Sequence, residues 1–142
     1  MRIVTRVYIS HTSGDQAIAQ AVESELRRNG FDVRNDEKNV SAGQDWAKVV
    51  TSALDSTDAI IAILSKYSYS SSWVRSELEN ALFNEKFKGK FLPVLISDDK
   101  AELSRLPWVL SKIHHLQLSP SESPAVLAEI IVRDFLQYLG RG

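Results

Sequence analysis

The sequence predicts an α/β domain built as a doubly wound parallel sheet of five strands, with helices on both faces. Short β-branched and apolar runs alternate with helical stripes along the chain, which is typical of consecutive β–α–β units with right-handed crossovers. One of these runs, residues 59–64, is apolar at every position, as expected of a central strand that is buried on both faces. The length of 142 residues suits a single domain.

The strands and helices can be assigned in order along the chain. Strands are expected at residues 4–10, 31–34, 59–64, 91–96 and 113–118. Helices are expected to start near residues 13, 41, 73 and 123, with a further short helix within residues 98–108. Ser13 and Gln16 have the spacing of a capping box for the first helix, and Gly30 should end it. The last helix should have Pro124 as its first residue and should end at Gly140.

The charge balance argues against two classes of partner. The chain has 17 basic and 18 acidic side chains, so its formal net charge is −1. Nucleic acids and acidic membrane surfaces are bound by basic stripes, so we expect neither as a partner. No apolar run approaches the roughly 20 residues that span a bilayer.

No metal site is expected. The chain lacks cysteine, which removes disulfides, thiol nucleophiles and thiolate ligands and fits a reducing compartment such as the cytoplasm. His114 and His115 are adjacent in the last predicted strand. Neighbouring strand residues point to opposite faces, so these two side chains should not share a metal ion.

The common strand order of such a sheet indicates where a ligand would bind. We expect a flavodoxin-like sheet of this order, 2-1-3-4-5, in which ligands sit beyond the carboxyl ends of the strands, at the switch between the first and third strands. The first loop there, residues 10–14, contains His11, a candidate for ligand contact. The second loop, residues 65–72, leads to Trp73 and Glu77, which share one helix face. This predicts a tryptophan and a carboxylate at the crevice. The alternative interpretation is a packed tryptophan beside a solvated glutamate without a function at a site.

Several familiar chemistries lack their motifs. Neither G-x-G-x-x-G nor G-x-x-x-x-G-K-[ST] occurs, which argues against a dinucleotide fingerprint and a P-loop. There is no G-x-S-x-G nucleophile elbow. A phosphoacceptor receiver domain would need acidic residues after the first and third strands, where this chain has Ser10-His11 and Ser65-Lys66.

Four segments resemble the sequence boxes of TIR (Toll/interleukin-1 receptor) domains. They are Val7-Tyr8-Ile9-Ser10-His11 followed by Asp15; Asp36 with Val40, Gly43 and Trp46; Ser65 and Tyr69 followed by Ser72-Trp73 and Glu77-Leu78; and Leu106-Pro107. The resemblance runs from about residue 7 to residue 139. It implies that residues 1–142 are a single TIR domain and leaves open that this domain is a piece of a longer multidomain protein.

The TIR family contains both scaffolds and NAD⁺-cleaving enzymes. The resemblance implies that Glu77 is catalytic and that Trp73 lines the pocket for the nicotinamide ribose. The other substrate-binding residues that it implies are Ser10, His11, Thr12, Val40 and Gly43. The loop carrying the last two would close over this pocket or over that of a neighbouring subunit. NAD⁺ is then the substrate, and no cofactor is implied.

Two positions and one loop depart from the family pattern. Val74 stands where a cysteine often follows the tryptophan, and His11 stands where enzymatic relatives often carry a basic residue. The loop of residues 35–43 lacks the proline that is common in animal receptors and adaptors. This last departure favours a bacterial-type or plant-like enzyme over an animal adaptor.

The leading interpretation is an NAD⁺ glycohydrolase or cyclase that acts in cytoplasmic immune or anti-phage signalling. It would release nicotinamide together with ADP-ribose or a cyclic isomer, and the sequence does not decide between these products. The resemblance implies self-association with other TIR domains and a sensor or oligomerising region elsewhere in a longer protein. The alternative is a non-catalytic module that assembles with other TIR domains, and a third reading is a virulence factor acting on host signalling.

Overall fold

A five-stranded parallel sheet organises the molecule, in the order β2-β1-β3-β4-β5 that the sequence predicts. The computed structural model describes residues 6–11, 13–34, 57–65, 89–99 and 113–141. Its strands are β1 (Arg6–Ser10), β2 (Asp32–Arg34), β3 (Ala59–Leu64), β4 (Phe91–Ile96) and β5 (Leu116–Leu118). Within these ranges the helical elements are η1, a 3-10 turn (Ser13–Asp15), α1 (Gln16–Arg28) and α6 (Pro124–Arg141). The helices predicted near residues 41 and 73 lie outside the described residues, as does most of the segment 98–108.

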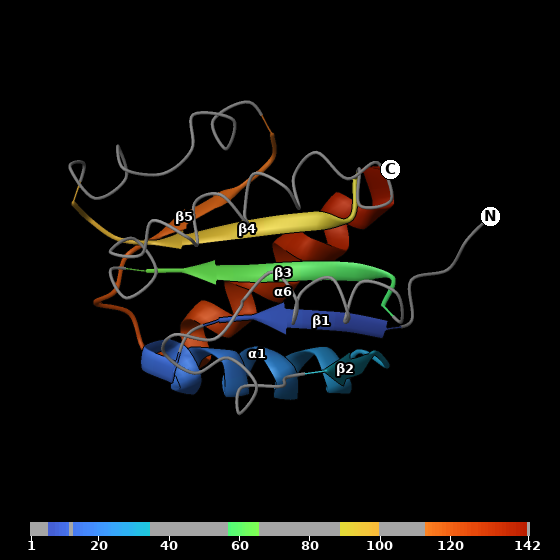
Figure 1. Ribbon diagram of the computed structural model, residues 1–142, viewed down its shortest axis with the longest axis horizontal. Coiled ribbons are helices and arrows are strands. Elements are labelled where there is room, and N and C mark those ends of the chain that lie inside the picture. The colour runs from blue at the N-terminus through green and yellow to red at the C-terminus, as the bar shows by residue number, and fades with distance from the viewer. Residues whose placement is uncertain (1–5, 12, 35–56, 66–88, 100–112, 142) are drawn as a thin grey trace.

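All neighbouring strands run parallel, so their carboxyl ends share one edge of the sheet. In Figure 1 the arrowheads of β1, β3 and β4 point to this edge, on the left. We call it the carboxyl edge. The bounds of β3 and β4 are those predicted from the sequence, because both strands are apolar at every position and are buried on both faces.

The described helices pack together on one face of the sheet. Figure 1 shows α6 passing behind β3 and β4, and α1 and α6 contact each other extensively. The core beneath them takes alternate residues of the strands, among them Val7, Ile9, Ile61, Ile63, Leu92 and Val94. The helices contribute Ala19, Val22, Leu26, Leu127, Ile131 and Phe135 to the same core. The intervening strand residues, such as Tyr8 and Ile60, point to the opposite face and are also buried.

The two ends of α1 compare differently with their prediction. The prediction that Ser13 and Gln16 form a capping box at the start of the helix is wrong. Ser13 begins the 3-10 turn, and Asp15 is the N-cap of α1. No side-chain hydrogen bond caps the helix. The predicted stop at Gly30 is confirmed. Gly30 has φ +86° and donates its N–H to Arg27, while Phe31 donates to Leu26, which together form a Schellman motif.

The last strand begins later than predicted, whereas the last helix begins at the predicted residue and ends one residue later than predicted. β5 begins at Leu116 instead of residue 113. His114 and His115 therefore precede the strand, and strand alternation does not direct their side chains to opposite faces. Pro124 is the first residue of α6, and the Ser123 hydroxyl accepts a hydrogen bond from the Val126 N–H at 3.3 Å. Gly140 lies within α6, which ends at Arg141, because a glycine without a positive φ does not have to end a helix.

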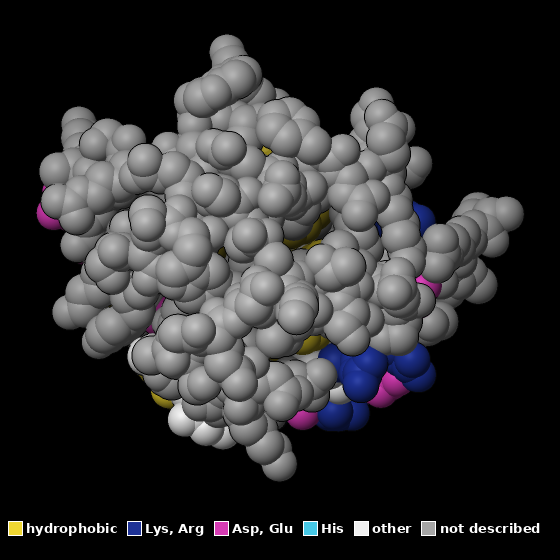
Figure 2. Space-filling model, viewed as in Figure 1, with side chains coloured by type: hydrophobic (Ala, Val, Ile, Leu, Met, Phe, Trp, Pro, Cys, Tyr) yellow, Lys and Arg dark blue, Asp and Glu magenta, His cyan; other side chains and the backbone are white. Residues whose placement is uncertain are grey.

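The visible charged surface near β2 is mixed in sign. Figure 2 shows basic and acidic side chains gathered together at the lower right. The ion pairs of this region include Arg6–Asp32 at 2.8 Å, Arg27–Glu23 at 3.0 Å and Arg28–Glu25 at 3.0 Å. Among the residues that the structure describes, no helix is both long enough and apolar enough to cross a bilayer.

Candidate functional site

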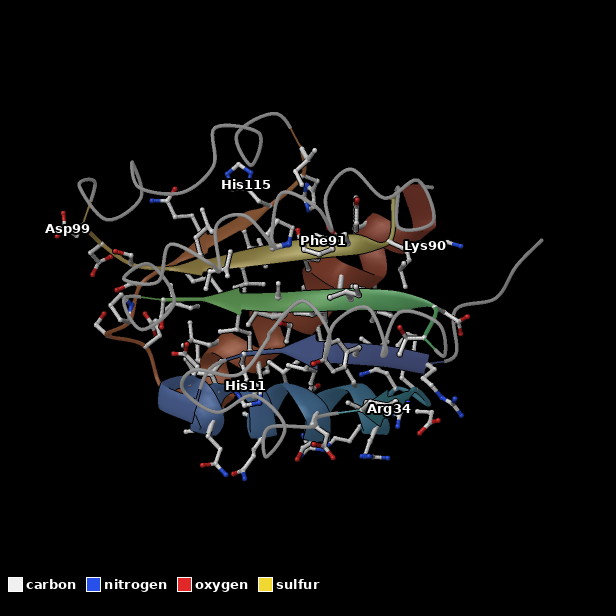
Figure 3. All side chains as sticks on the ribbon, viewed as in Figure 1. His11, Arg34, Lys90, Phe91, Asp99 and His115 are labelled. Carbon is white, nitrogen blue, oxygen red and sulfur yellow. The ribbon has the colours of Figure 1, made fainter. Side chains whose placement is uncertain are left out.

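Polar side chains gather where the strands end at the carboxyl edge. Ser10 is the last residue of β1 and His11 follows it, while Ser65 follows β3 and Ser97 follows β4. Each is nearly inaccessible to solvent, with exposed fractions of 3% or 4%. Figure 3 shows His11 close to the start of α1 and Asp99 further out at the same edge, whereas Lys90 lies at the opposite edge. The carboxyl edge therefore contains buried polar side chains, and the acidic residues Asp98 and Asp99 are exposed at its outer end.

A buried hydrogen bond joins the start of α1 to the end of β3. The Ser65 hydroxyl donates to Oδ2 of Asp15 across 2.6 Å, although the residues are 50 positions apart in the chain. Both side chains are 4% exposed. A carboxylate at a helix N-terminus commonly accepts hydrogen bonds from the first backbone N–H groups, but the Asp15 side chain forms no such cap. Its Oδ2 reaches across to the neighbouring strand instead.

A second set of hydrogen bonds organises the turns after β4 and β5. The Ser97 hydroxyl accepts the Asp99 N–H at 3.0 Å, and the Ser97 N–H donates to the Leu118 carbonyl. The Ser119 hydroxyl donates to Oδ2 of Asp98 at 2.9 Å. These contacts fix the Asp98-Asp99 turn next to the start of α6.

A cavity of about 490 Å³ lies between these turns and the helix N-termini. Its described lining combines apolar side chains with acidic ones and contains no lysine, arginine or histidine. The apolar members include Ile18, Ile96 and Leu127, and the acidic members are Asp15, Asp98, Asp99 and Glu122. The N-terminal ends of α1 and α6 carry partial positive charge, which stabilises carboxylates placed there.

Ser10 and this cavity lie on different faces of the sheet. Val7 and Ile9 belong to the core under α1 and α6, so the alternation of β1 directs Ser10 to the opposite face. The cavity is lined by Ile18 of α1 and Leu127 of α6, which places it on the helix side. Neither Ser10 nor His11 is among its described lining residues. The described lining therefore reaches the two loops expected at the switch point through Gly14 and Ser65, and not through Ser10 or His11.

The structure describes part of the predicted substrate site. Ser10 and His11 lie at the end of β1, next to β3, at the topological switch point where the strand order placed them. The remaining site predictions concern Thr12, Val40, Gly43, Trp73 and Glu77, which lie outside the described residues. Within the described ranges, no group of three or more histidine, aspartate and glutamate side chains could hold a metal ion.

Sequence reasoning missed the role of Asp15. An aspartate just before a helix predicts a cap on the surface, whereas Asp15 is buried and bonded to Ser65. Its distant partner leaves no periodic signal in the sequence. The sequence feature that could have indicated this contact is the polar residue at the end of each long strand. Polar groups at adjacent strand ends meet at one edge of a parallel sheet.

Comparisons with known proteins identify a family. The model of the TIR domain family matches residues 7–131. Among solved structures, the chain is similar to the RPS4 and RRS1 TIR domain heterodimer, with a TM-score of 0.67, 20% identity, and coverage of 94% of this chain and 97% of that one. It is also similar to the TIR domain of the Toll-related receptor TRR-2 from Hydra magnipapillata, with a TM-score of 0.61, 16% identity, and coverage of 92% and 97%.

A third similar structure is much longer than this chain. It is a metazoan TIR-STING receptor from C. gigas in complex with 2′,3′-cGAMP, with a TM-score of 0.66 and 20% identity. The match covers 94% of this chain but 38% of the receptor chain, so the chain spans little more than a third of that receptor. No curated protein matches the chain in sequence. At these identities, the structural likenesses show the fold.

Proposed function

Because the chain belongs to the TIR domain family, we propose that it cleaves NAD⁺ at the bond between nicotinamide and ribose. The observation that carries this proposal is the extent of the family match. Residues 7–131 include Trp73 and Glu77 at helical spacing, as well as Ser10 and His11 at the switch point of the sheet. These are the residues that NAD⁺-cleaving members of the family would use.

The chemistry needs few protein groups. Nicotinamide leaves NAD⁺ as a neutral molecule, because the electrons of the broken C–N bond cancel the charge of its ring nitrogen. The remaining ribosyl centre resembles an oxocarbenium ion, as in glycoside hydrolysis. The Glu77 carboxylate would stabilise this cation and bind ribose hydroxyls, and the face of Trp73 would pack on the cationic nicotinamide ring.

The second half of the reaction decides the product. Attack by water at the ribosyl carbon gives ADP-ribose and releases one proton to solvent. Attack by a nucleophile of the same molecule, on its adenine or ribose, gives a cyclic isomer and likewise releases a proton. Both routes use NAD⁺ as the substrate and need no additional cofactor.

Self-association is part of this proposal. One similar structure is a heterodimer of the TIR domains of RPS4 and RRS1, and another comes from the TIR domains of the activated Roq1 resistosome. We propose that this chain likewise acts when several copies assemble. The proposed setting is cytoplasmic immune or anti-phage signalling, with a sensor or oligomerising region in a longer protein.

The second candidate function is a non-catalytic interaction module that assembles with other TIR domains. The RPS4 and RRS1 heterodimer favours it, because that structure is itself a pair of TIR domains. The two candidates differ in their need for Glu77. An interaction module would still bind other TIR domains without this carboxylate, whereas the enzyme would lose its turnover of NAD⁺.

Nicotinamide release provides the test. The chain is incubated with NAD⁺ both in free solution and tethered at high density on beads, and the products are separated by chromatography. We expect release from the tethered chain and its loss in Glu77→Gln. Glu79→Gln is the matched control, because it removes a carboxylate two positions away in the same segment, and it should keep the activity.

The outcomes separate the two candidates. Release that Glu77→Gln leaves unchanged would overturn the assignment of Glu77. No release from tethered chain, combined with binding to a second copy, would favour the interaction module. Chromatography of the products also distinguishes ADP-ribose from its cyclic isomers.

A further inference from the structure

We infer that Asp15 and Ser65 are positioning residues for the proposed NAD⁺ site. Their buried hydrogen bond fixes the turn that carries Ser10 and His11 against the end of β3. This inference rests on the proposed function and extends it, because neither Asp15 nor Ser65 is among the residues assigned above to contact substrate. Three features of the molecule support this role: the bond itself, the way it holds the turn, and the place of the turn at the switch point.

The bond is short and shielded from water. At 2.6 Å, the separation of the Ser65 and Asp15 oxygens is typical of a hydroxyl that donates to a carboxylate. Both side chains are 4% exposed, so loss of either partner would leave a buried polar group with one hydrogen bond fewer. A contact that is costly to break holds the two segments in one arrangement.

The turn after β1 is held at both of its ends. At one end Ser10 is paired in register with Ala62 of β3. At the other end Asp15 bonds to Ser65, three residues further along the same segment. Because both ends are attached to β3 and its extension, His11 is confined between them, and its side chain is 4% exposed.

This arrangement links two parts of the sequence that the proposed site needs together. Ser10 and His11 are expected to bind the substrate, and Ser65 begins the stretch of sequence that leads to Trp73 and Glu77. Catalysis depends on holding such groups within a fraction of an ångström, and a misplacement of about 1 Å can cost about 100-fold in rate. Asp15 and Ser65 act through the groups that they position and need not touch NAD⁺ themselves.

Kinetics of Ser65→Ala test the inference. The rate of nicotinamide release by the tethered chain is measured against NAD⁺ concentration, well below the unfolding temperature, and is expressed per folded molecule. We expect kcat/KM to fall by about 10-fold or more, since the turn loses the hydrogen bond that attaches Asp15 to the end of β3. Ser65→Thr keeps the hydroxyl and should restore most of the activity.

The matched control is Ser97→Ala. Ser97 is also a serine that follows a long strand at the carboxyl edge, and it is also 4% exposed. Its hydroxyl forms partly buried hydrogen bonds with the backbone of Asp99. It lies after β4, away from the switch between β1 and β3. Its truncation should therefore leave kcat/KM within about twofold of the parent, while costing a similar amount of stability.

A double-mutant cycle tests whether Asp15 and Ser65 act through the same contact. Asp15→Ala and Ser65→Ala should each lower kcat/KM, and the double variant should be no worse than the more damaging single variant, because both break one contact. Circular dichroism and thermal unfolding of each variant establish the folded fraction. If Asp15→Ala does not fold, the comparison of Ser65→Ala with Ser65→Thr and Ser97→Ala still tests the inference.

The results distinguish this inference from the proposed function. If the parent chain releases nicotinamide and Ser65→Ala releases it at the same rate per folded molecule, the positioning role is overturned. The proposed function would still stand in that case. An equal loss in Ser97→Ala would also overturn it, because the effect would then be a general loosening of the edge. No release by the tethered parent chain would overturn the proposed function, and this inference with it.

Discussion

His114 and Asp134 form a contact between the segment that precedes β5 and the helix α6. Nε2 of His114 lies 2.7 Å from Oδ2 of Asp134, and both side chains are partly buried. The His114 ring also stacks on Tyr138, one helical turn further along α6, with ring centroids 4.8 Å apart and planes inclined by 22°. The imidazole is thus held between a carboxylate and a phenol of the same helix.

The His114–Asp134 pair should contribute to stability as a unit. We expect His114→Ala and Asp134→Ala each to lower the free energy of unfolding by about 1 kcal/mol, as a partly buried hydrogen bond does. The double variant should lose less than the sum, which urea unfolding can measure. His115→Ala is the control, because Nδ1 of His115 lies 2.9 Å from the carbonyl of nearby Ile113 and the pair makes no link between elements. Strict additivity would contradict the prediction.

Tyr138 should make stability depend on pH in alkaline solution. Burial raises the pKa of the Tyr138 phenol above its ordinary value of 10.0. The native chain therefore holds this proton to higher pH than the unfolded chain, so the contribution is complete below about pH 10 and is lost as the pH rises through the native pKa.

Tyr138→Phe removes this titration and keeps the ring. Between pH 8 and pH 11, chosen as the range of the experiment, the unfolding temperature of the parent chain should fall more steeply than that of the variant, and the two should run parallel below about pH 9. Curves that stay parallel through pH 11 would show that the phenol titrates alike in both states.

Gly30, at the end of α1, should tolerate alanine poorly. Its φ of +86° lies in the left-handed region, and a Cβ added there would meet nothing within 4 Å. The cost of Gly30→Ala is therefore backbone strain without a clash, and we expect a loss of about 1 kcal/mol in the free energy of unfolding. Gly140→Ala is the control, since Gly140 lies inside α6 without a positive φ and alanine is the better helix former. Equal losses at both positions would refute the prediction.

Trp73 should matter more for turnover than for folding. On the reading that its ring packs against nicotinamide, Trp73→Ala should lower the rate of nicotinamide release by about 10-fold and leave the far-ultraviolet circular dichroism spectrum unchanged. Thermal unfolding of the same variant provides the check. Global unfolding would mean that Trp73 belongs to the core.

Local patterns predict the sheet well because they follow from burial. β3 and β4 have their predicted bounds, since strands buried on both faces must be apolar at every position. The end of α1 at Gly30 is also local, because the Schellman motif needs a positive φ that glycine adopts without strain. β5 is less well predicted: it extends over Leu116–Leu118, and the preceding His114 contacts α6.

The sequence by itself determined the parallel α/β sheet, because neighbouring residues specify the alternation of apolar runs with helical stripes. The order 2-1-3-4-5 was expected as the common one for such a sheet, and with it the position of Ser10 and His11 at the switch point, and the tertiary structure has that order. Tertiary structure decided that Asp15 bonds to Ser65 instead of capping α1, and that His114 turns to Asp134. A buried polar group bonds to whichever partner the fold brings within reach, and partners 50 and 20 positions away leave no periodic trace in the sequence.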